Sequence, residues 1–397
     1  MNSSPNQVAV AEMPGGNIVY AGSQMYMSWD GTGDPIFFTN INYTILDHGG
    51  NTVLPQKMID LNPGPSLESF VHGPVIDVAP NGNIGMLWTN EVYDRDTKLS
   101  NVNLFMAVMD SDGNIIFGPS DLTGNTSWGS NATGDAFGYE SPRITASDDG
   151  KFFISWGAYD QEPEGYIRDI YYGIRNNDGS QSIANAKLTN GVVGGDFNYE
   201  PALAALDGNK TLVAWHGSGE TKYVVLNNDG SIAKASTAIS GPGLINIDAV
   251  QLSDSNILLA GQNGSREIFF SILDGSTYLV NEPLSALQNP ISASQNEYVS
   301  VTRDENGHGI LTWADYSSQY IFYALVNSSG DVLTAPTILK EAEEYQYKFI
   351  DTSSQGYGNT TYSPAAWIEV LDKEIYGFVS PGTHEYAFKV QNLGSLG

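Results

Sequence analysis

The sequence predicts an all-β fold, a seven-bladed β-propeller of four-stranded antiparallel blades, and three observations lead to it. A strand, a tight turn and a second strand ending in tryptophan form a phrase that recurs, as in "YESPRITASDDGKFFISW" and "YEPALAALDGNKTLVAW". The breaks between apolar runs carry the Gly, Asp and Asn that β-hairpins require, and no stretch keeps a helical period. The copies recur at intervals that suit propeller blades.

Apolar strands ending in tryptophan mark five copies of the repeat, at Trp88, Trp156, Trp215, Trp313 and Trp367. Two degenerate copies fill the gaps, "NIVYAG" with Tyr20 and "NILLAG" with Ala260. Seven four-stranded units are too many for one open sheet. Radial stacking leaves only short, protected edges, which favours a propeller. A β-solenoid and tandem sandwiches are the alternatives, and the coils of a solenoid are much shorter than this repeat.

The seven expected blades belong to a single domain over residues 1–397. They span residues 5–67, 68–136, 137–196, 197–243, 244–295, 296–343 and 344–393. In this arrangement each tryptophan ends the second strand of its blade and packs between neighbouring blades. We therefore expect these tryptophans to be core residues and not a carbohydrate-binding platform.

Composition and charge exclude several classes of partner. The chain has 17 Lys and Arg against 45 Asp and Glu, a formal net charge of −28. Nucleic acid binding needs clustered basic side chains, so no nucleic acid partner is expected. Cysteine is absent, which excludes disulfides and thiolate metal sites. No apolar run reaches the length of a membrane span, so no membrane insertion is expected.

The expected location is extracellular or at the cell surface, and the expected state is a monomer that forms part of a longer multidomain chain. The start, "MNSSPNQVAV", lacks the basic and apolar regions of a signal peptide. A secreted form would therefore be mature, or a piece cut from a longer chain.

The loops between the second and third strands of the blades are the expected recognition surface. They vary in length and composition over residues 89–101, 157–169, 216–222 and 314–319, whereas the turns at the opposite end are short and alike. Variable loops on a rigid scaffold are where binding residues usually lie. The candidate ligand-binding residues in these loops are Tyr93, Asp94, Tyr159, Asp160 and Tyr316.

A second set of candidate ligand-binding residues lies where the innermost strands begin. His72, Glu140 and Glu297 stand 16 residues before their tryptophans, and Glu200 stands 15 before Trp215. Tyr139, Tyr199 and Tyr298 lie beside them. In a propeller these side chains would surround one channel mouth and could hold a ligand or Ca²⁺. The alternative, which we favour, is a repeated blade-joining contact in which each carboxylate accepts N–H groups of a neighbouring loop.

No motif for catalysis stands out, so the sequence leans towards a binding protein. "DSDGN" at residues 110–114 lacks a suitably spaced Glu and is better explained as a hairpin turn than as a calcium loop. The five histidines form no zinc-binding pair. A glycosidase would need two carboxylates. If the protein is an enzyme, Glu140, Glu200 and His216 are the candidates, and whether any metal is bound is left open.

The whole chain resembles the repeat propellers of bacterial extracellular and surface proteins. The resemblance lies in the pattern D-G-N/K-x-x-x-x-W and its variants, in "DGKFFISW", "DGNKTLVAW", "NGNIGMLW" and "NGHGILTW". The layout is similar to that of sialidase-type propellers, although the Ser-x-Asp-x-Gly-x-Thr-Trp box and a blade-closing Trp-Asp dipeptide are absent. The resemblance indicates architecture better than activity, because propellers include both enzymes and binding scaffolds. The variable loops, their aromatic and acidic residues and the lack of a catalytic motif favour a non-catalytic extracellular module that binds a glycan or a protein surface. The alternatives are a polysaccharide-cleaving hydrolase or lyase and a structural spacer.

Overall fold

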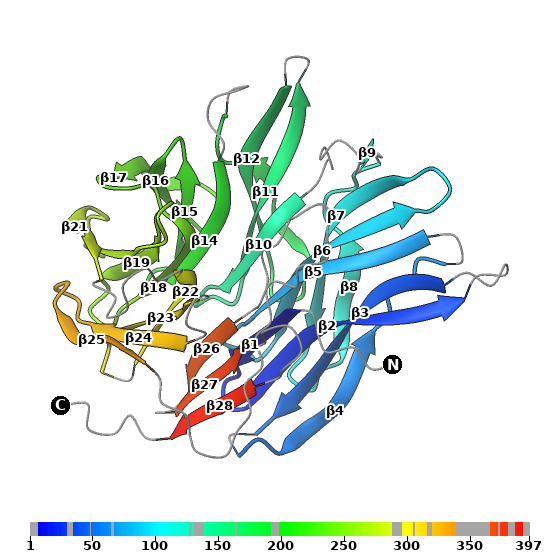
Figure 1. Ribbon diagram of the computed structural model, residues 1–397, viewed down its shortest axis with the longest axis horizontal. Coiled ribbons are helices and arrows are strands. Elements are labelled where there is room, and N and C mark those ends of the chain that lie inside the picture. Colours follow the sequence, from blue (N-terminus) through cyan, green and yellow to red (C-terminus); the bar gives the residue numbers. More distant parts are fainter. Residues whose placement is uncertain are drawn as a thin grey trace. The chain divides into compact units, whose positions relative to one another are not determined.

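A computed structural model describes most of the chain, and all of its regular elements there are β-strands (Figure 1). The described residues are 7–29, 35–47, 49–64, 67–126, 129–130, 139–162, 165–191, 198–287, 296–304, 306–315, 320–338, 366–371, 374–379 and 386–391. The strands fall into two compact units. Strands β1 to β13 belong to the first unit, and strands β14 to β28 belong to the second.

The first unit holds three antiparallel four-stranded sets. The first set is β1 (Gln7–Glu12), β2 (Ile18–Trp29), β3 (Pro35–Leu46) and β4 (Thr52–Ile59). The second is β5 (Leu67–Val78), β6 (Ile84–Asp94), β7 (Leu99–Met109) and β8 (Ile115–Asp121), with the short β9 (Gly129–Ser130) beside β7. A single bridge between Phe38 and Ser69 joins these two sets. The third is β10 (Tyr139–Ala146), β11 (Phe152–Glu162), β12 (Gly165–Arg175) and β13 (Gln181–Lys187).

The second unit repeats the same antiparallel order in three four-stranded sheets and one three-stranded sheet. The first two sheets are β14 (Asn198–Leu206), β15 (Lys210–Gly217), β16 (Glu220–Asn227), β17 (Ile232–Ile239), and β18 (Ile245–Gln251), β19 (Ile257–Gln262), β20 (Ile268–Leu273), β21 (Val280–Ala286). The others are β22 (Asn296–Arg303), β23 (Gly309–Asp315), β24 (Tyr320–Val326), β25 (Val332–Ile338), and β26 (Ala366–Leu371), β27 (Glu374–Val379), β28 (Tyr386–Gln391).

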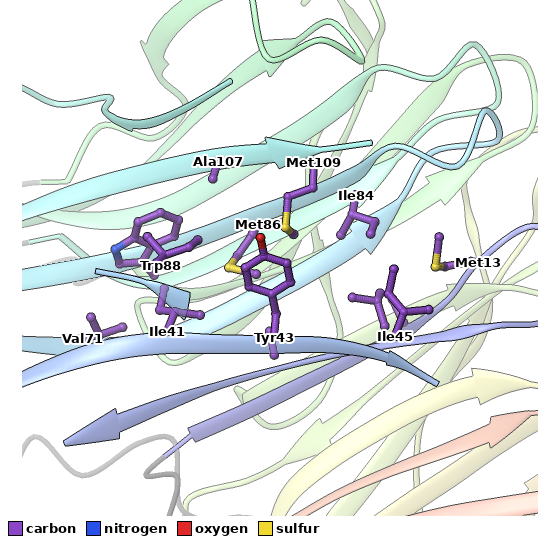
Figure 2. Packing of buried hydrophobic residues seen from close by; sticks show 14 residues of the cluster. Met13, Ile41, Tyr43, Ile45, Val71, Ile84, Met86, Trp88, Ala107 and Met109 are labelled. Carbon is purple, nitrogen blue, oxygen red and sulfur yellow. The ribbon is translucent and has the colours of Figure 1, made fainter. Parts of the chain in front are cut away.

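The core lies between neighbouring sheets within each unit. In the first unit, Ile41, Tyr43 and Ile45 of β3 pack against Ile84, Met86 and Trp88 of β6 (Figure 2). Alternate residues of a strand point to the same face, so each sheet buries one such row against each neighbour. Trp88 and Trp156 are almost wholly buried and stack on Phe105 and Tyr171 of the adjacent strands. The expectation that these tryptophans are core residues is confirmed.

The tryptophans do not end their strands, however, and this expectation was wrong. β6 runs on from Trp88 to Asp94, and β11 runs on from Trp156 to Glu162. The sequence segments expected to be long loops are instead continuations of the hairpin ladder, because backbone pairing persists after the apolar core ends. The β-strands of the first unit therefore project beyond the tryptophan layer.

The two degenerate copies of the repeat are also placed differently from the expectation. The strand that follows each short turn begins at Ile18, Ile84 and Ile257, and Trp88 is the fifth residue of its strand. The same position in the other two strands is Gly22 and Gly261, not Tyr20 and Ala260. A Cβ at Gly261 would lie 3.0 Å from the Ile245 carbonyl oxygen and 3.1 Å from Leu244 Cβ, so the neighbouring residues would have to shift to admit a larger side chain.

The short turns are closed by their own backbone and side chains. In "DSDGN", the N–H groups of Asp112 and Asn114 donate to Asp110 Oδ1 over 3.0 and 2.8 Å. Gly113 takes a φ of +69°, which glycine adopts without strain. These hydrogen bonds lower the pKa of Asp110, with the Asn114 N–H as the largest cause. The segment is a hairpin turn, as the sequence favoured.

A polar side chain on the third strand anchors the segment that leads out of each sheet in the first unit. Asn40 Oδ1 accepts the Leu61 N–H, and Asn103 Oδ1 accepts the Asn125 N–H over 2.7 Å. Asp169, which is fully buried, accepts the Gly191 N–H over 2.7 Å and binds Lys187 Nζ at 2.6 Å. All three polar residues lie opposite the second residue after the tryptophan position. The repeat therefore determines both the pairing within each sheet and the anchoring of the segment that follows it.

Candidate functional site

Each innermost strand of the described blades, β1 apart, carries a bulge, which lies near the middle of β5 and near the start of the others. The pairing register shifts after His72, Glu140, Tyr199, Ile245 and Glu297. The first bulged residue has a positive φ in four cases, at Gly73 (57°), Ser141 (47°), Glu200 (55°) and Asn246 (50°). Positive φ is uncommon in residues other than glycine, so the repeat holds a strained backbone at this point. A bulge of this kind re-aims the side chains on either side of it.

The register corrects the expected alignment of the carboxylates. Glu140, Tyr199 and Glu297 lie opposite the residue that follows the tryptophan, as does His72. Glu200 lies one residue further along and occupies the bulge itself. The two hairpins pair in the same register, with Ala146 opposite Phe152 and Ala205 opposite Thr211, so the difference lies in the sequence: Glu200 stands 15 residues before its tryptophan and Glu140 stands 16 before.

Glu200 joins two adjacent sheets of the second unit. Its Oε2 accepts the N–H of Asn246, the equivalent bulge residue of the next sheet, over 2.7 Å. The Asp248 carboxylate makes a similar contact further along, accepting the Val301 N–H over 2.9 Å. In the first unit, Asp77 accepts the Ala146 N–H over 2.8 Å. These contacts have the form of the blade-joining alternative, in which a carboxylate accepts a neighbouring N–H group.

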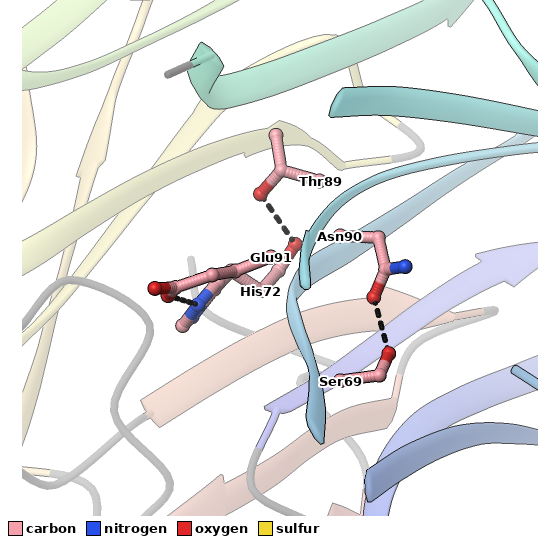
Figure 3. Close-up of polar contacts among 5 residues, drawn as sticks. All are labelled: Ser69, His72, Thr89, Asn90 and Glu91. Atoms are coloured by element: carbon pink, nitrogen blue, oxygen red, sulfur yellow. Dashed lines mark hydrogen bonds and ion pairs between the residues drawn. The ribbon is translucent and has the colours of Figure 1, made fainter. Parts of the chain in front are cut away.

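His72 has a different environment, because it faces a second titratable side chain. His72 Nε2 lies 3.4 Å from Glu91 Oε2 (Figure 3), and the exposed fractions of the two side chains are 45% and 19%. Thr89 Oγ1 donates to the His72 carbonyl, and Ser69 Oγ donates to Asn90 Oδ1 over 2.8 Å. The pair is accessible to solvent and combines a donor with an acceptor on neighbouring strands.

The end of the β6–β7 hairpin carries Tyr93 and Asp94. Tyr93 pairs with Ser100 across the ladder and is half-buried. The Asp94 carboxylate accepts the N–H groups of Asp96 and Thr97 over 2.8 and 3.2 Å, so it caps the turn. These hydrogen bonds lower the pKa of Asp94, led by the one from Asp96. Tyr93 lies two residues after Glu91, on the face of the strand that also carries Glu91.

The β11–β12 hairpin presents a tyrosine beneath a guanidinium. Arg168 lies 4.9 Å above the Tyr159 ring centroid, and the two residues pair directly across the ladder. The backbone of Asp160 pairs with that of Ile167. This arrangement holds one face of the Tyr159 ring by cation–π attraction.

His216 is tied to the backbone. Its Nδ1 lies 2.9 Å from the Leu244 carbonyl oxygen, in the segment that leads into β18. The other sequence candidates are placed by their backbone in the innermost strands: Tyr139 and Glu140 in β10, Tyr199 in β14, and Glu297 and Tyr298 in β22. Tyr316 lies outside the described residues. The predicted ring of these residues draws on both units and stays a prediction.

The structure adds a set of residues that the sequence reasoning missed. At the end of the β2–β3 hairpin, Met27, Trp29 and Phe37 have exposed fractions of 48%, 64% and 36%. The repeat identified only tryptophans that were expected in the core. Trp29 was missed because it belongs to no copy of the repeat. The alternation of apolar residues in "MYMSW" and "PIFF" was the signal available in the sequence.

The described part of the chain contains neither a cluster of metal-ligating side chains nor a long apolar helix. There, no three His, Asp or Glu side chains gather closely enough to hold a metal ion. No helix long and apolar enough to cross a membrane occurs in the same residues. The expectation of Ca²⁺ stays a prediction.

Comparisons with known proteins bear on the fold. No protein-family model matches the sequence, and a search of curated proteins found no match. A protein of unknown function from Dyadobacter fermentans is similar in structure, with a TM-score of 0.52 and 12% identity over 85% of this chain and 94% of that one. The WD40 domain of Toxoplasma gondii coronin gives a TM-score of 0.50 and 8% identity over 98% of this chain and 82% of that one.

A third similar structure is a Penicillium chrysogenum alpha-L-arabinanase complexed with arabinobiose, with a TM-score of 0.49 and 11% identity over 85% of this chain and 93% of that one. At these identities, structural likeness concerns the fold alone. WD40 domains are β-propellers built from four-stranded blades. The chain has an all-β fold of the β-propeller type with four-stranded antiparallel sheets, and a blade count of seven stays a prediction.

Proposed function

We propose that the protein is a non-catalytic recognition module that binds a glycan through the β6–β7 and β11–β12 hairpins of the first unit. The observation that carries this proposal is the accessible His72–Glu91 pair on an extended hairpin that also bears Tyr93. A carboxylate accepts sugar hydroxyl protons and an imidazole exchanges hydrogen bonds with them. A tyrosine ring offers an apolar surface with a polar tip, which suits the C–H face of a sugar.

The contrast between the two units supports this choice of surface. In the second unit, β15 continues past Trp215 only as far as Gly217, which pairs with Glu220 at the end of the hairpin. The projecting ladders of β6 and β11 therefore have no counterpart in the β15–β16 hairpin. Extra chain that adds nothing to the apolar core is more readily explained by binding than by stability.

An extracellular or cell-surface location belongs to the same proposal. It rests on the resemblance to the repeat propellers of bacterial extracellular and surface proteins. Ca²⁺ is the candidate cofactor, since oxygen-rich acidic surfaces favour this cation. A monomer within a longer chain is the proposed state.

A glycan array with and without chelator tests the proposal. We expect wild-type protein to bind a defined glycan class, and Glu91→Gln and His72→Ala to weaken that binding about tenfold or more. Glu220→Gln, at an exposed carboxylate of the second unit, is the matched control and should bind like wild type. Loss of binding on chelation would support Ca²⁺. Absence of binding to any glycan, or an equal loss in the control, would overturn the proposal.

The same samples test the enzyme alternative. Glu200 and His216 are both engaged with backbone groups, which leaves neither as an unoccupied catalytic group. If the protein released reducing ends or unsaturated products from a polysaccharide, the proposal of a recognition module would be replaced by that of an enzyme. In that case Glu140→Gln, with folding intact, shows whether this carboxylate takes part.

A further inference from the structure

The exposed end of the β2–β3 hairpin has two faces of opposite character. Ile36 is 1% exposed, and Phe38, which stacks on Tyr26 with ring centroids 5.8 Å apart, is 9% exposed. The other face carries Met27, Trp29 and Phe37, all three of them exposed. The hairpin is thus held to the protein by one face and presents the second to solvent.

The three exposed side chains form one continuous patch. Met27 pairs directly with Phe37, and Trp29 pairs with Pro35 at the next position of the same face. Side chains directly opposite in an antiparallel pair lie about 5 Å apart. We call this patch, made of Met27, Trp29, Pro35 and Phe37, the hairpin face. An exposed cluster with Trp and Met is typical of protein-binding surfaces, where aromatic residues supply most of the affinity.

The chemistry of the hairpin face separates it from the proposed glycan site. The remaining side chains of this face, Met25 and Thr39, add one thioether and one hydroxyl, and Thr39 is 2% exposed. The Trp29 indole N–H is thus the main polar group that the described residues of this face offer a ligand. Sugar recognition needs several convergent hydrogen-bonding groups, whereas docking of an apolar protein segment does not.

Charge indicates the kind of segment that fits. The sequence has no Lys or Arg before Lys57, and the chain carries a net charge of −28. A second copy of the chain would bring the same negative charge to the contact. A segment with Lys or Arg next to apolar side chains is attracted by the protein and can place a cation over the Trp29 ring.

We propose that the hairpin face docks an apolar segment of another protein that carries Lys or Arg. This interaction is separate from glycan binding and uses different residues of the first unit. Met side chains allow such a surface to adapt to partners of varied shape.

Fluorescence polarisation with the full chain tests the proposal, using labelled synthetic peptides of alternating leucine and lysine or of alternating leucine and glutamate. At a salt concentration of about 150 mM, which screens long-range attraction, the lysine peptide should bind more tightly than the glutamate peptide. Trp29→Ser and Met27→Ser should weaken its binding about tenfold. Val53→Ser on β4, where the side chain is 54% exposed, is the matched control and should change binding less than twofold.

Four outcomes would overturn the proposal. The control could lose as much affinity as the Trp29 variant, or the glutamate peptide could bind as tightly as the lysine peptide. Sedimentation could show a dimer that Trp29→Ser dissociates, which would make a second copy the occupant. Trp29→Ser could abolish glycan binding and leave peptide binding unchanged, which would assign the hairpin face to a glycan. Retained glycan binding in Trp29→Ser supports the separation of the two sites.

Discussion

At the scale of single residues, the contact between the Glu200 carboxylate and the Asn246 N–H determines what a substitution at Glu200 will do. Glu200→Ala removes the acceptor and leaves a bulge N–H without its partner, which should lower the free energy of unfolding by about 1–3 kcal/mol. Glu200→Gln keeps an acceptor oxygen and should cost less. Chemical denaturation measures both, with Glu220→Ala at a 54% exposed side chain as the control. A loss in Glu200→Ala no larger than in the control would contradict the blade-joining role.

The core tryptophans offer a second residue-scale prediction, because their indole N–H groups differ. Trp215 Nε1 donates to Asn198 Oδ1 over 3.1 Å. The Trp156 Nε1 is buried and has no hydrogen-bond partner among the described residues. Trp→Phe removes similar volume at both positions, yet only at Trp215 does it break a hydrogen bond. We expect Trp215→Phe to be more destabilising than Trp156→Phe by about 1 kcal/mol, as measured by thermal unfolding. Equal losses would show that packing alone sets the cost.

At the scale of elements, the anchored segments between sheets predict a graded response. Asp169 holds Lys187 and the Gly191 N–H while fully buried, so Asp169→Ala leaves a cation and a backbone donor without their acceptor. Hydrogen bonds to a charged group are worth about 1.5–3 kcal/mol each, and water partly solvates Lys187, whose side chain is 34% exposed, so Asp169→Ala should cost about 2–4 kcal/mol. Asn103→Ala removes only neutral hydrogen bonds and should cost about 1–3 kcal/mol.

Denaturation of the two variants and of Asp169→Asn separates charge from hydrogen bonding. Asp169→Asn keeps an acceptor oxygen and should fall between the two alanine variants. An Asp169→Ala variant as stable as Asn103→Ala would mean that the Lys187 contact adds nothing to stability.

The elements also show how far sequence reasoning reaches. Period-two apolar runs between Gly-, Asp- and Asn-rich turns predicted the strands, because turn chemistry and strand pattern are local properties. The continuation of β6 to Asp94 could not be predicted from the sequence. Beyond Trp88 the strand is held by backbone pairing, and its polar residues are of types that also form loops. The one-residue offset of Glu200 was present in its spacing from Trp215, but spacing from a tryptophan cannot reveal that this position is a bulge.

At the scale of the whole molecule, the sequence predicted the propeller class but only part of the surface proposed for binding. The repeat specifies sheets because each copy must bury the same two faces. His72 and Glu91 lie diagonally across the neighbouring strands β5 and β6, and only His72 was a candidate from the sequence. Trp29 was missed because exposure is a property of the packed molecule and not of its repeat.

The stability of the folded chain should depend on pH through two carboxyl groups whose pKa values are shifted in opposite directions. Hydrogen bonds from the side chain of Ser276 and from Thr277 lower the pKa of Asp274 to about 2. The native state therefore prefers its carboxylate, so its stabilising contribution is present above pH 3.8 and is lost as the pH falls towards 2. Burial raises the pKa of Asp77 although it accepts N–H groups, so its contribution is present below pH 3.8 and is lost as the pH rises through the folded value.

Melting temperatures of Asp274→Asn and Asp77→Asn across the acidic range test these signs. Near neutral pH, Asp274→Asn should melt below wild type and Asp77→Asn should melt above it, because the second variant removes a buried charge but keeps an acceptor for the Ala146 N–H. The Asp274→Asn difference should shrink as the pH falls from about 4 to about 2, whereas the Asp77→Asn difference should shrink earlier, as the pH falls through the raised pKa of Asp77 towards about 4. If Asp77→Asn melts below wild type near neutral pH, the ionised carboxylate contributes more through its hydrogen bonds than burial costs it.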